Sequence, residues 1–167
     1  MSSAQPLRWS HLRNLARSPL HYRHALEHGT VQTPAMRLGS LVHAMVFGTG
    51  GFVRFDGTRR GKEWAAFLEE HGHEGEIVTA EEWDRADQTA QAARLDPVAA
   101  QFLCGTVEQR ISWTIGRREC SGTPDVRGVD RDGMPFLCDL KTTADASPQR
   151  FPNFAMRSAY LGQMAWY

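Results

Sequence analysis

Two short acidic motifs lie close together in the second half of the chain. Asp125 closes a Pro-Asp pair, and Asp139 and Lys141 form an Asp-x-Lys motif in residues 135–141, which read as a β-strand. Side chains alternate between the two faces of a strand, so Asp139 and Lys141 should point the same way. The linker, residues 129–133, ends in Asp-Gly, a strong hairpin signal that would bring Asp125 close to Asp139. The sequence thus predicts two carboxylates and one ammonium group converging at the end of a small sheet.

This combination of groups suits metal-assisted hydrolysis of a phosphodiester. Mg²⁺ is usually held by one or two carboxylates together with water and phosphate oxygens. A bound metal ion lowers the pKa of its water and neutralises charge on the reacting phosphate. Lys141 could orient the attacking water or stabilise the developing negative charge. The alternative is an exposed hairpin with scattered charges, because Asp-x-Lys alone occurs often by chance.

The segments around these motifs predict strands that carry the acids and helices that flank them. Apolar and polar side chains alternate over residues 107–115, which indicates a half-buried strand, and residues 120–126 follow as a second strand. With residues 135–141 these strands would form a three-stranded antiparallel meander. Ser10, Ser18 and Thr79 are expected as helix N-caps. Helices are expected over residues 9–17, 19–28, 35–47, 63–71, 80–95 and 97–103, with short strands at 52–55 and 77–78.

Length, composition and cysteine usage indicate an ordinary globular protein. The 167 residues suit one domain, and no run of apolar residues is long enough to span a membrane. The N-terminus lacks the apolar region of a signal peptide. Three cysteines without a Cys-x-x-Cys pair are expected as buried free thiols of a cytoplasmic protein, not as a zinc or iron–sulfur site.

Basic side chains are unevenly distributed, although the net charge is zero. Residues 1–43 carry five arginines, among them Arg13 and Arg17, against the single acid Glu27. A glycine-bearing basic loop follows later in the chain and contains Arg59, Arg60 and Lys62. This asymmetry is compatible with one basic face that binds a DNA backbone, and equally with ordinary scatter of surface charge.

Four further side chains are candidates for the same site. His43 lies in a predicted helix beside apolar residues, where a core histidine is the alternative to a metal ligand. Glu108 lies on the polar face of the first predicted strand, either near the metal or in solvent. Gln163 and Tyr167 share one face of a C-terminal helix with Tyr160. An aromatic stripe is typical of a core, but a glutamine within it suits a phosphate or a metal-bound water.

The order of these motifs resembles that of the PD-(D/E)xK nuclease superfamily. The resemblance is carried by His43, Asp125, Asp139-Leu140-Lys141 and Gln163-x-x-x-Tyr167. Within the superfamily the likeness is greatest to the phage-type exodeoxyribonuclease VIII (RecE-like) branch, and more distant to lambda exonuclease and the RecB nuclease domain. Residues 10–22 resemble the N-terminal helix pair of that branch, residues 39–43 its histidine motif and residues 60–64 its basic segment.

The resemblance implies an α/β (α+β) fold with a restriction-endonuclease-like core, in which helices flank a small mixed sheet and the metals lie at one sheet edge. The implied ligands of Mg²⁺ or Mn²⁺ are His43, Asp125, Asp139 and the backbone carbonyl of Leu140. Lys141 would be catalytic, and Gln163 and Tyr167 would position the nucleophile or the scissile phosphate. Glu108 matches an acidic position that occurs in some relatives.

The function implied by the resemblance is a Mg²⁺- or Mn²⁺-dependent deoxyribonuclease, most simply an exonuclease acting on duplex DNA ends in phage-type recombination. Relatives form toroidal homo-oligomers and leave a 3′ overhang for annealing, so a ring and a single-strand annealing protein are the expected partners. An endonuclease of the same superfamily and an inactive DNA-binding module are the alternatives. The intact Asp-Asp-Lys set argues against the inactive module.

The C-terminus and the second acid depart from the pattern of these relatives. Residues 1–167 would form a single nuclease domain, but the chain ends at Tyr167, where relatives usually continue with more strand and helix. It could therefore be a truncated piece, a minimal form or a remnant. The second acid is Asp139 rather than Glu, so its side chain has a shorter reach, but the motif permits either residue.

Overall fold

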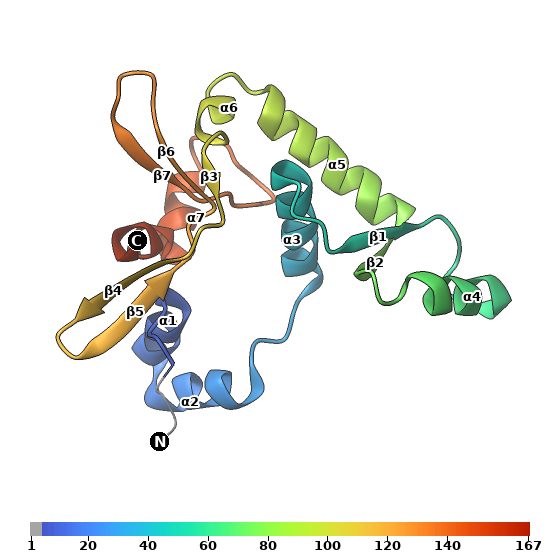
Figure 1. Ribbon diagram of the computed structural model, residues 1–167, viewed down its shortest axis with the longest axis horizontal. Helices are drawn as coiled ribbons and strands as arrows, with labels where there is room; N and C mark the ends of the chain where they lie inside the picture. The colour runs from blue at the N-terminus through green and yellow to red at the C-terminus, as the bar shows by residue number, and fades with distance from the viewer. Residues whose placement is uncertain (1–4) are drawn as a thin grey trace. The chain divides into compact units, whose positions relative to one another are not determined.

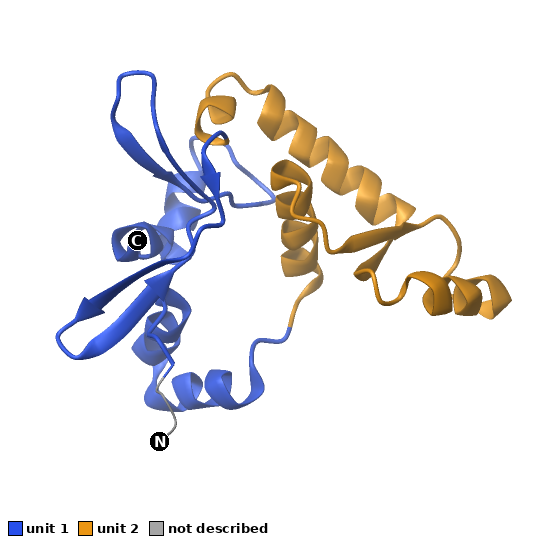
Figure 2. Ribbon diagram, in the orientation of Figure 1, with its two compact units in different colours: residues 1–31, 104–167 blue, residues 32–103 orange. Residues whose placement is uncertain are grey.

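The computed structural model describes residues 5–167, which divide into two compact units (Figures 1 and 2). Unit 2 is the continuous stretch of residues 32–103, and unit 1 combines the chain up to residue 31 with residues 104–167. Among the described residues, no helix combines the length and the apolar character needed to cross a membrane.

Unit 2 alternates helices with two short parallel strands. Its elements are α3 (Pro34–Phe47), β1 (Phe52–Phe55), α4 (Gly61–His71), β2 (Glu76–Thr79), α5 (Ala80–Leu95) and α6 (Ala99–Phe102). Strand β1 pairs in parallel with β2, and α4 makes the connection between them. Helix α3 packs along α5, where Ala86 and Ala90 are completely buried and their small side chains permit a close approach. Leu41 and Val42 fill the facing side of α3 and are each about 1% exposed.

The helix ends of unit 2 follow local sequence signals. Thr33 caps α3 by accepting a hydrogen bond from the Met36 N–H, and Pro34 takes the first helical position. Thr79 and Glu82 form a reciprocal capping box at the start of α5, which confirms the N-cap prediction for Thr79. These contacts satisfy backbone N–H groups that a helix leaves without partners.

Unit 1 contains the motifs that the sequence singles out. Its elements are α1 (Trp9–Arg17), α2 (Pro19–His28), β3 (Thr106–Val107), β4 (Ile111–Ile115), β5 (Arg118–Gly122), β6 (Val126–Val129), β7 (Pro135–Cys138), α7 (Phe151–Arg157) and α8 (Tyr160–Trp166). The strands form a three-stranded sheet in the order β3-β6-β7 and a separate β4-β5 hairpin. Ser18 caps α2 as predicted, but Ser10 does not cap α1, because the N-cap is Arg8 and the helix therefore begins at Trp9.

The α/β class is confirmed, but the single meander predicted over residues 107–141 is wrong. The first predicted strand is broken at Glu108, whose φ of 49° is left-handed and cannot continue a strand. This break separates β3 from β4 into different sheets. The second predicted strand stops at Gly122, because Pro124, two residues later, has no N–H to donate. The third stops at Cys138, three residues before Lys141.

The predicted Asp-Gly hairpin is confirmed between β6 and β7. The two strands pair antiparallel, with Val126 opposite Cys138 and Val129 opposite Pro135. The Asp130 N–H donates to the Met134 carbonyl at 2.8 Å across the turn, and Gly133 adopts a φ of 80° that favours glycine. The turn therefore sets the register of the two strands, and this register determines which residues lie opposite each other at the open end of the hairpin.

Candidate active site

The open end of the β6-β7 hairpin carries the two aspartates. Val126 is completely buried and pairs with Cys138. Asp125 directly precedes Val126 and Asp139 directly follows Cys138, so the two acids leave the hairpin at the same level on neighbouring strands. Hairpin register thus places the two carboxyl-bearing residues next to each other without any helix contributing.

Asp125 is tied to the Asp-x-Lys motif by a backbone hydrogen bond. Its Oδ2 accepts from the Leu140 N–H at 2.6 Å. This bond orients the carboxylate and also anchors the peptide at Leu140, whose carbonyl is a predicted ligand. A carboxylate has about four lone-pair sites, so one such bond leaves acceptor capacity for a cation.

Asp139 is largely enclosed, with a side chain that is 6% exposed. Its Oδ2 forms an ion pair with the Lys141 ammonium, and its Oδ1 accepts from Gln163 Nε2 at 3.1 Å. A carboxylate so far from water requires this kind of compensation, because burying an unpaired charge is costly. Asp139 therefore joins the hairpin end to the C-terminal helix.

Gln163 and Tyr167 reach the cluster from α8 and from the residue that ends it. Gln163 Nε2 also donates to the Tyr167 hydroxyl at 2.8 Å. The helix is held in place by Trp166, whose indole N–H donates to the Ser121 carbonyl at 3.1 Å. Gly122 permits the close approach, since a Cβ there would lie 2.5 Å from the Tyr167 ring. The predicted shared face of Gln163 and Tyr167 thus points at Asp139 through Gln163.

The protein environment disfavours the charged form of Lys141. Burial lowers the pKa of its ammonium group; the negative charge of Asp125 opposes this shift, and the positive charge of Arg13 adds to it. The Lys141 side chain is 25% exposed, and its Nζ lies 5.3 Å from the centroid of the Tyr160 ring. An ammonium held this way can act on a phosphate as a positioned, partly desolvated donor.

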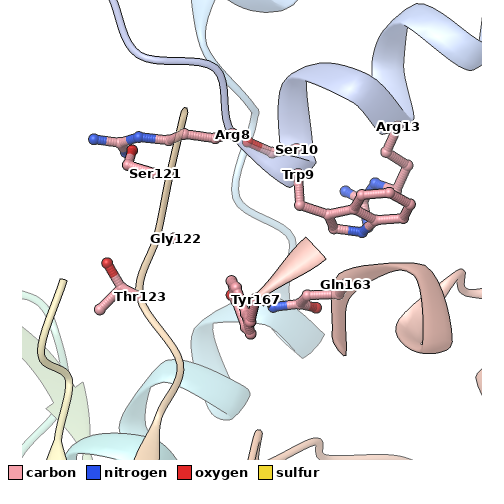
Figure 3. Close-up of a pocket in the computed structure, with 9 residues that line it drawn as sticks. All are labelled: Arg8, Trp9, Ser10, Arg13, Ser121, Gly122, Thr123, Gln163 and Tyr167. Carbon is pink, nitrogen blue, oxygen red and sulfur yellow. Dashed lines mark hydrogen bonds between the residues drawn. The ribbon is translucent and has the colours of Figure 1, made fainter. Parts of the chain in front are cut away.

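A pocket of about 320 Å³ lies beside the cluster and shares Gln163 and Tyr167 with it (Figure 3). Figure 3 shows Trp9 and Arg13 projecting from α1 on one side, with Gln163 and Tyr167 on the other. Arg8 also lines the pocket, together with Ser121 and Gly122 at the end of β5 and Thr123 directly after it. Arg8, Trp9 and Thr123 were not predicted as site residues.

The position of Arg8 depends on the pairing of the preceding residue with β5, which the local sequence does not predict. Leu7 forms a parallel bridge with Cys120, in which the Leu7 N–H donates to the Glu119 carbonyl and the Ser121 N–H donates to the Leu7 carbonyl, both at 2.8 Å. This bridge carries Arg8 and the start of α1 to the end of β5. Leu7 lies beside Pro6 and has no strand pattern around it, so local sequence does not predict this pairing.

The donor set of the cluster fits a hard divalent cation. Among the described residues, no group of three or more His, Cys, Asp or Glu side chains is arranged to hold a metal ion. Two adjacent carboxylates and a peptide carbonyl match Mg²⁺, which takes one or two protein carboxylates and completes its shell with water and phosphate. The residues present thus fit a cation shared with a substrate, and not a dedicated protein cage.

The other predicted site residues have different surroundings. The backbone N–H of Glu108 donates to the Asp125 carbonyl at 3.0 Å, so Glu108 neighbours the cluster through the main chain while its side chain is exposed. Arg13 lines the pocket, and Arg17 is exposed at the end of α1. His43 lies on α3 of unit 2, and its role as a metal ligand stays a prediction.

The basic loop predicted to touch DNA lies in unit 2. Arg59 Nη2 donates to the Ile77 carbonyl at 2.7 Å and to Glu82 at 3.2 Å, so its guanidinium stabilises that unit. Arg60 and Lys62 are exposed at the start of α4. DNA binding by these three residues stays a prediction.

Comparison with known protein families gives a match that spans both units. The family described as PDDEXK-like domain of unknown function (DUF3799) matches residues 9–167 and includes every residue of the cluster. No curated protein and no solved structure matches the chain. The resemblance is confirmed at the level of the PD-(D/E)xK superfamily, which points to a nuclease-type function. The closer likeness to RecE-like exonucleases stays a prediction. Because the match covers nearly the whole chain, this protein belongs to the family of PDDEXK-like domains of unknown function.

Proposed function

We propose that the protein is a Mg²⁺- or Mn²⁺-dependent deoxyribonuclease that hydrolyses DNA phosphodiesters. The observation that carries this proposal is the contact network at the open end of the β6-β7 hairpin. There Asp125 accepts from the Leu140 N–H, and Asp139 is paired with Lys141 and hydrogen-bonded to Gln163. Family membership supports the same class of activity.

Each member of the network has a chemical task in this proposal. Asp125, Asp139 and the Leu140 carbonyl hold the cation, which when bound lowers the pKa of a water and neutralises phosphate charge. Lys141 donates from its ammonium to the water or to a non-bridging phosphate oxygen, so that negative charge developing there is stabilised. The existing bond between Asp125 and the Leu140 N–H preorganises two of the three oxygen donors.

Gln163 and Tyr167 act as positioning residues. Gln163 donates both to Asp139 and to the Tyr167 hydroxyl, so it fixes the orientation of the carboxylate and of the phenol together. Groups that orient the ligands of a metal in this way tune its affinity and activity. In addition, the amide and the phenol present polar atoms where a scissile phosphate would meet the cluster.

The finer points of the proposal rest on the resemblance. We favour exonucleolytic action from duplex ends in a recombination setting, with a homo-oligomeric ring for processivity and a single-strand annealing protein as partner. His43 is assigned as a further ligand, whose nitrogen would make Mn²⁺ a good substitute for Mg²⁺.

Replacing His43 with Ala should raise the Mn²⁺ concentration for half-maximal cleavage by roughly 10- to 100-fold, as for loss of a metal-supporting group. An unchanged metal dependence would remove His43 from the site.

The deciding experiment compares linear duplex DNA with nicked circular duplex DNA. The protein is incubated with each substrate in Mg²⁺, in Mn²⁺ and in chelator, and the products are separated by gel electrophoresis. Loss of linear DNA alone supports the exonuclease, whereas cutting of circles supports an endonuclease. Folded protein that cleaves neither substrate with either metal contradicts the proposal and leaves a DNA-binding module.

A matched pair of variants tests whether any observed DNA cleavage depends on the carboxylate cluster. Asp139→Asn removes the enclosed carboxylate charge and should abolish metal-dependent cleavage. Asp132→Asn makes the same chemical change at an exposed position in the β6-β7 turn and should cleave like the wild type. Equal activity of the two variants would place the active centre elsewhere.

A further inference from the structure

The pocket beside the carboxylate cluster has a composition that the hydrolytic chemistry does not use. Its lining includes Arg8, Arg13 and the rings of Trp9 and Tyr167, and among the described residues no acidic side chain contributes to it. The whole chain has zero net charge, so a cationic and aromatic lining is a local property of this site. Arginine with aromatic rings is the combination that binds phosphate and stacks nucleobases.

The Trp9 ring is held as a fixed platform. Its six-membered ring packs against Gly162 of α8 so closely that no Cβ would fit at that position. The ring therefore loses little freedom when a ligand stacks on it, which favours binding. Tyr167 is similarly held, with its ring against Gly122 and its hydroxyl accepting from Gln163 at 2.8 Å.

The size of the pocket limits what can enter it. A volume of about 320 Å³ is at the small end of ligand sites, which span roughly 300–1,000 Å³. Such a pocket has room for one nucleotide, but not for a base pair within a duplex. A base that remains stacked in a duplex cannot offer its face to an aromatic ring, so the occupant must be unpaired.

The pocket lies next to the proposed cutting site. Gln163 lines the pocket and also donates to Asp139 at 3.1 Å, so one side chain separates the two regions. A DNA strand whose phosphate lies at the two aspartates therefore has its neighbouring nucleotide at the pocket.

We infer that this pocket is a subsite for one unpaired nucleotide, whose base stacks on Trp9 and whose phosphate meets Arg8 or Arg13. Its place next to the scissile phosphate rests on the proposed nuclease function, but the binding itself needs no cleavage. The Thr123 hydroxyl adds a donor and an acceptor for the sugar or the base edge. Because every base has a stacking face, the subsite should accept all four bases with modest preference.

The test measures binding without cleavage. The probes are a labelled oligothymidine single strand and a blunt-ended duplex, and their dissociation constants are measured by fluorescence anisotropy in chelator. Trp9→Leu should weaken binding of the oligothymidine by about 5- to 150-fold, the value of one base–aromatic stack. Trp9→Phe keeps a ring and should keep most of the affinity. Binding of the blunt duplex should change much less.

A cycle with an abasic probe separates stacking from general damage to the protein. An oligothymidine with one abasic residue is scanned through the sequence, and one position should weaken wild-type binding. At that position, the losses of binding free energy from removing the base and from removing the Trp9 ring should not add. The abasic probe should therefore bind the wild type and Trp9→Leu with nearly equal affinity. Thermal unfolding of each variant verifies that it is folded.

Charge variants test the phosphate contact. Arg8→Gln and Arg13→Gln should each reduce affinity, and at least one should lower the slope of log affinity against log salt by about 0.7, the value for one phosphate contact on a single strand. Arg117→Gln removes an exposed charge in the β4-β5 turn, outside the pocket, and should leave the slope unchanged.

Two results would overturn the subsite. The first is folded Trp9→Leu protein that binds the oligothymidine like the wild type, and the second is strictly additive losses in the abasic cycle. The experiments distinguish a wrong subsite proposal from a wrong nuclease proposal. Metal-dependent cleavage with Trp9-independent binding contradicts the subsite alone, whereas Trp9-dependent binding without any cleavage contradicts the nuclease and retains the subsite.

Discussion

The core of unit 2 and the functional end of unit 1 are held together by different kinds of contact. Unit 2 is built on buried apolar side chains such as Leu41, Val42 and Val78, which are each at most 1% exposed. At the functional end of unit 1, the order comes from hydrogen bonds and an ion pair around Asp125 and Asp139. A polar cluster of this kind contributes chemistry at some cost in stability, whereas an apolar core contributes stability without chemistry. Substitutions at the functional end of unit 1 should therefore mainly lower DNA cleavage, whereas substitutions in the core of unit 2 should mainly lower the free energy of unfolding.

After the loss of cleavage expected for Asp139→Asn, the largest effect is expected at Lys141. Lys141→Ala should lower the rate of DNA cleavage by on the order of 10²–10³, the loss typical of a donor that stabilises a developing charge. DNA binding should remain largely intact, because the substitution leaves the pocket and the two aspartates in place. Single-turnover cleavage and anisotropy measure the two properties separately. A variant that loses binding as much as cleavage would contradict the proposed role.

The opposite outcome is expected in the core of unit 2. Leu41→Ala should lower the free energy of unfolding by about 2–5 kcal/mol, because it deletes buried methyl groups and leaves a cavity. Urea denaturation followed by circular dichroism measures the loss. Leu95→Ala, at a side chain that is 81% exposed, provides the control and should change stability little. Equal losses in the two variants would mean that the α3-α5 packing does not stabilise the unit.

A smaller functional effect is expected at Gln163. Gln163→Leu keeps the size of the side chain but removes the donor shared by Asp139 and Tyr167. Cleavage should fall by roughly 10- to 100-fold, as for other groups that orient a metal ligand. Gln88→Leu, on the exposed side of α5, is the matched control. Wild-type metal affinity and rate in Gln163→Leu would show that Asp139 needs no positioning from α8.

The smallest effect is a pH dependence in unit 2. Burial raises the pKa of Glu82, but the hydrogen bond from Thr79 and the charge of Arg37 outweigh it, so the pKa is lowered overall. The folded state therefore favours the carboxylate, and the stability it contributes is complete above the ordinary glutamate pKa and is lost as the pH falls through the lowered value. Glu82 is 39% exposed, so solvent weakens the effect.

Urea unfolding measured over a series of acidic pH values tests this contribution. Glu82→Gln should be less stable than the wild type at neutral pH and should lose less stability on acidification. Glu81→Gln, in the same first turn of α5 but exposed, should retain the pH dependence of the wild type. If the free energy of unfolding fell by the same amount on acidification in the wild type and in Glu82→Gln, Glu82 would be excluded as the source of this pH dependence.

Local signals predicted the parts of the fold that depend on neighbouring residues. Thr79 with Glu82 marked the start of α5, and the Asp-Gly turn marked the β6-β7 hairpin. The failures have local causes that composition does not reveal. Glu108 takes a left-handed φ that its residue type does not favour, and Arg8 precedes the helix that Ser10 was expected to cap. Both depend on contacts with distant backbone, namely the Asp125 carbonyl and the Leu7 pairing with β5.

The sequence by itself determined the hairpin, and with it the adjacency of Asp125 and Asp139, because the turn sets the register of the two strands. It also assigned the chain to its superfamily through the order of a few polar motifs. Only the tertiary structure decided that Asp139 is enclosed between Lys141 and Gln163, and that Trp9 and two arginines form a pocket beside it. Asp139 and Gln163 are 24 positions apart, and the contact between Trp9 and Gly162 joins residues more than a hundred positions apart. These contacts arise from packing between elements, for which the sequence within each element carries no signal.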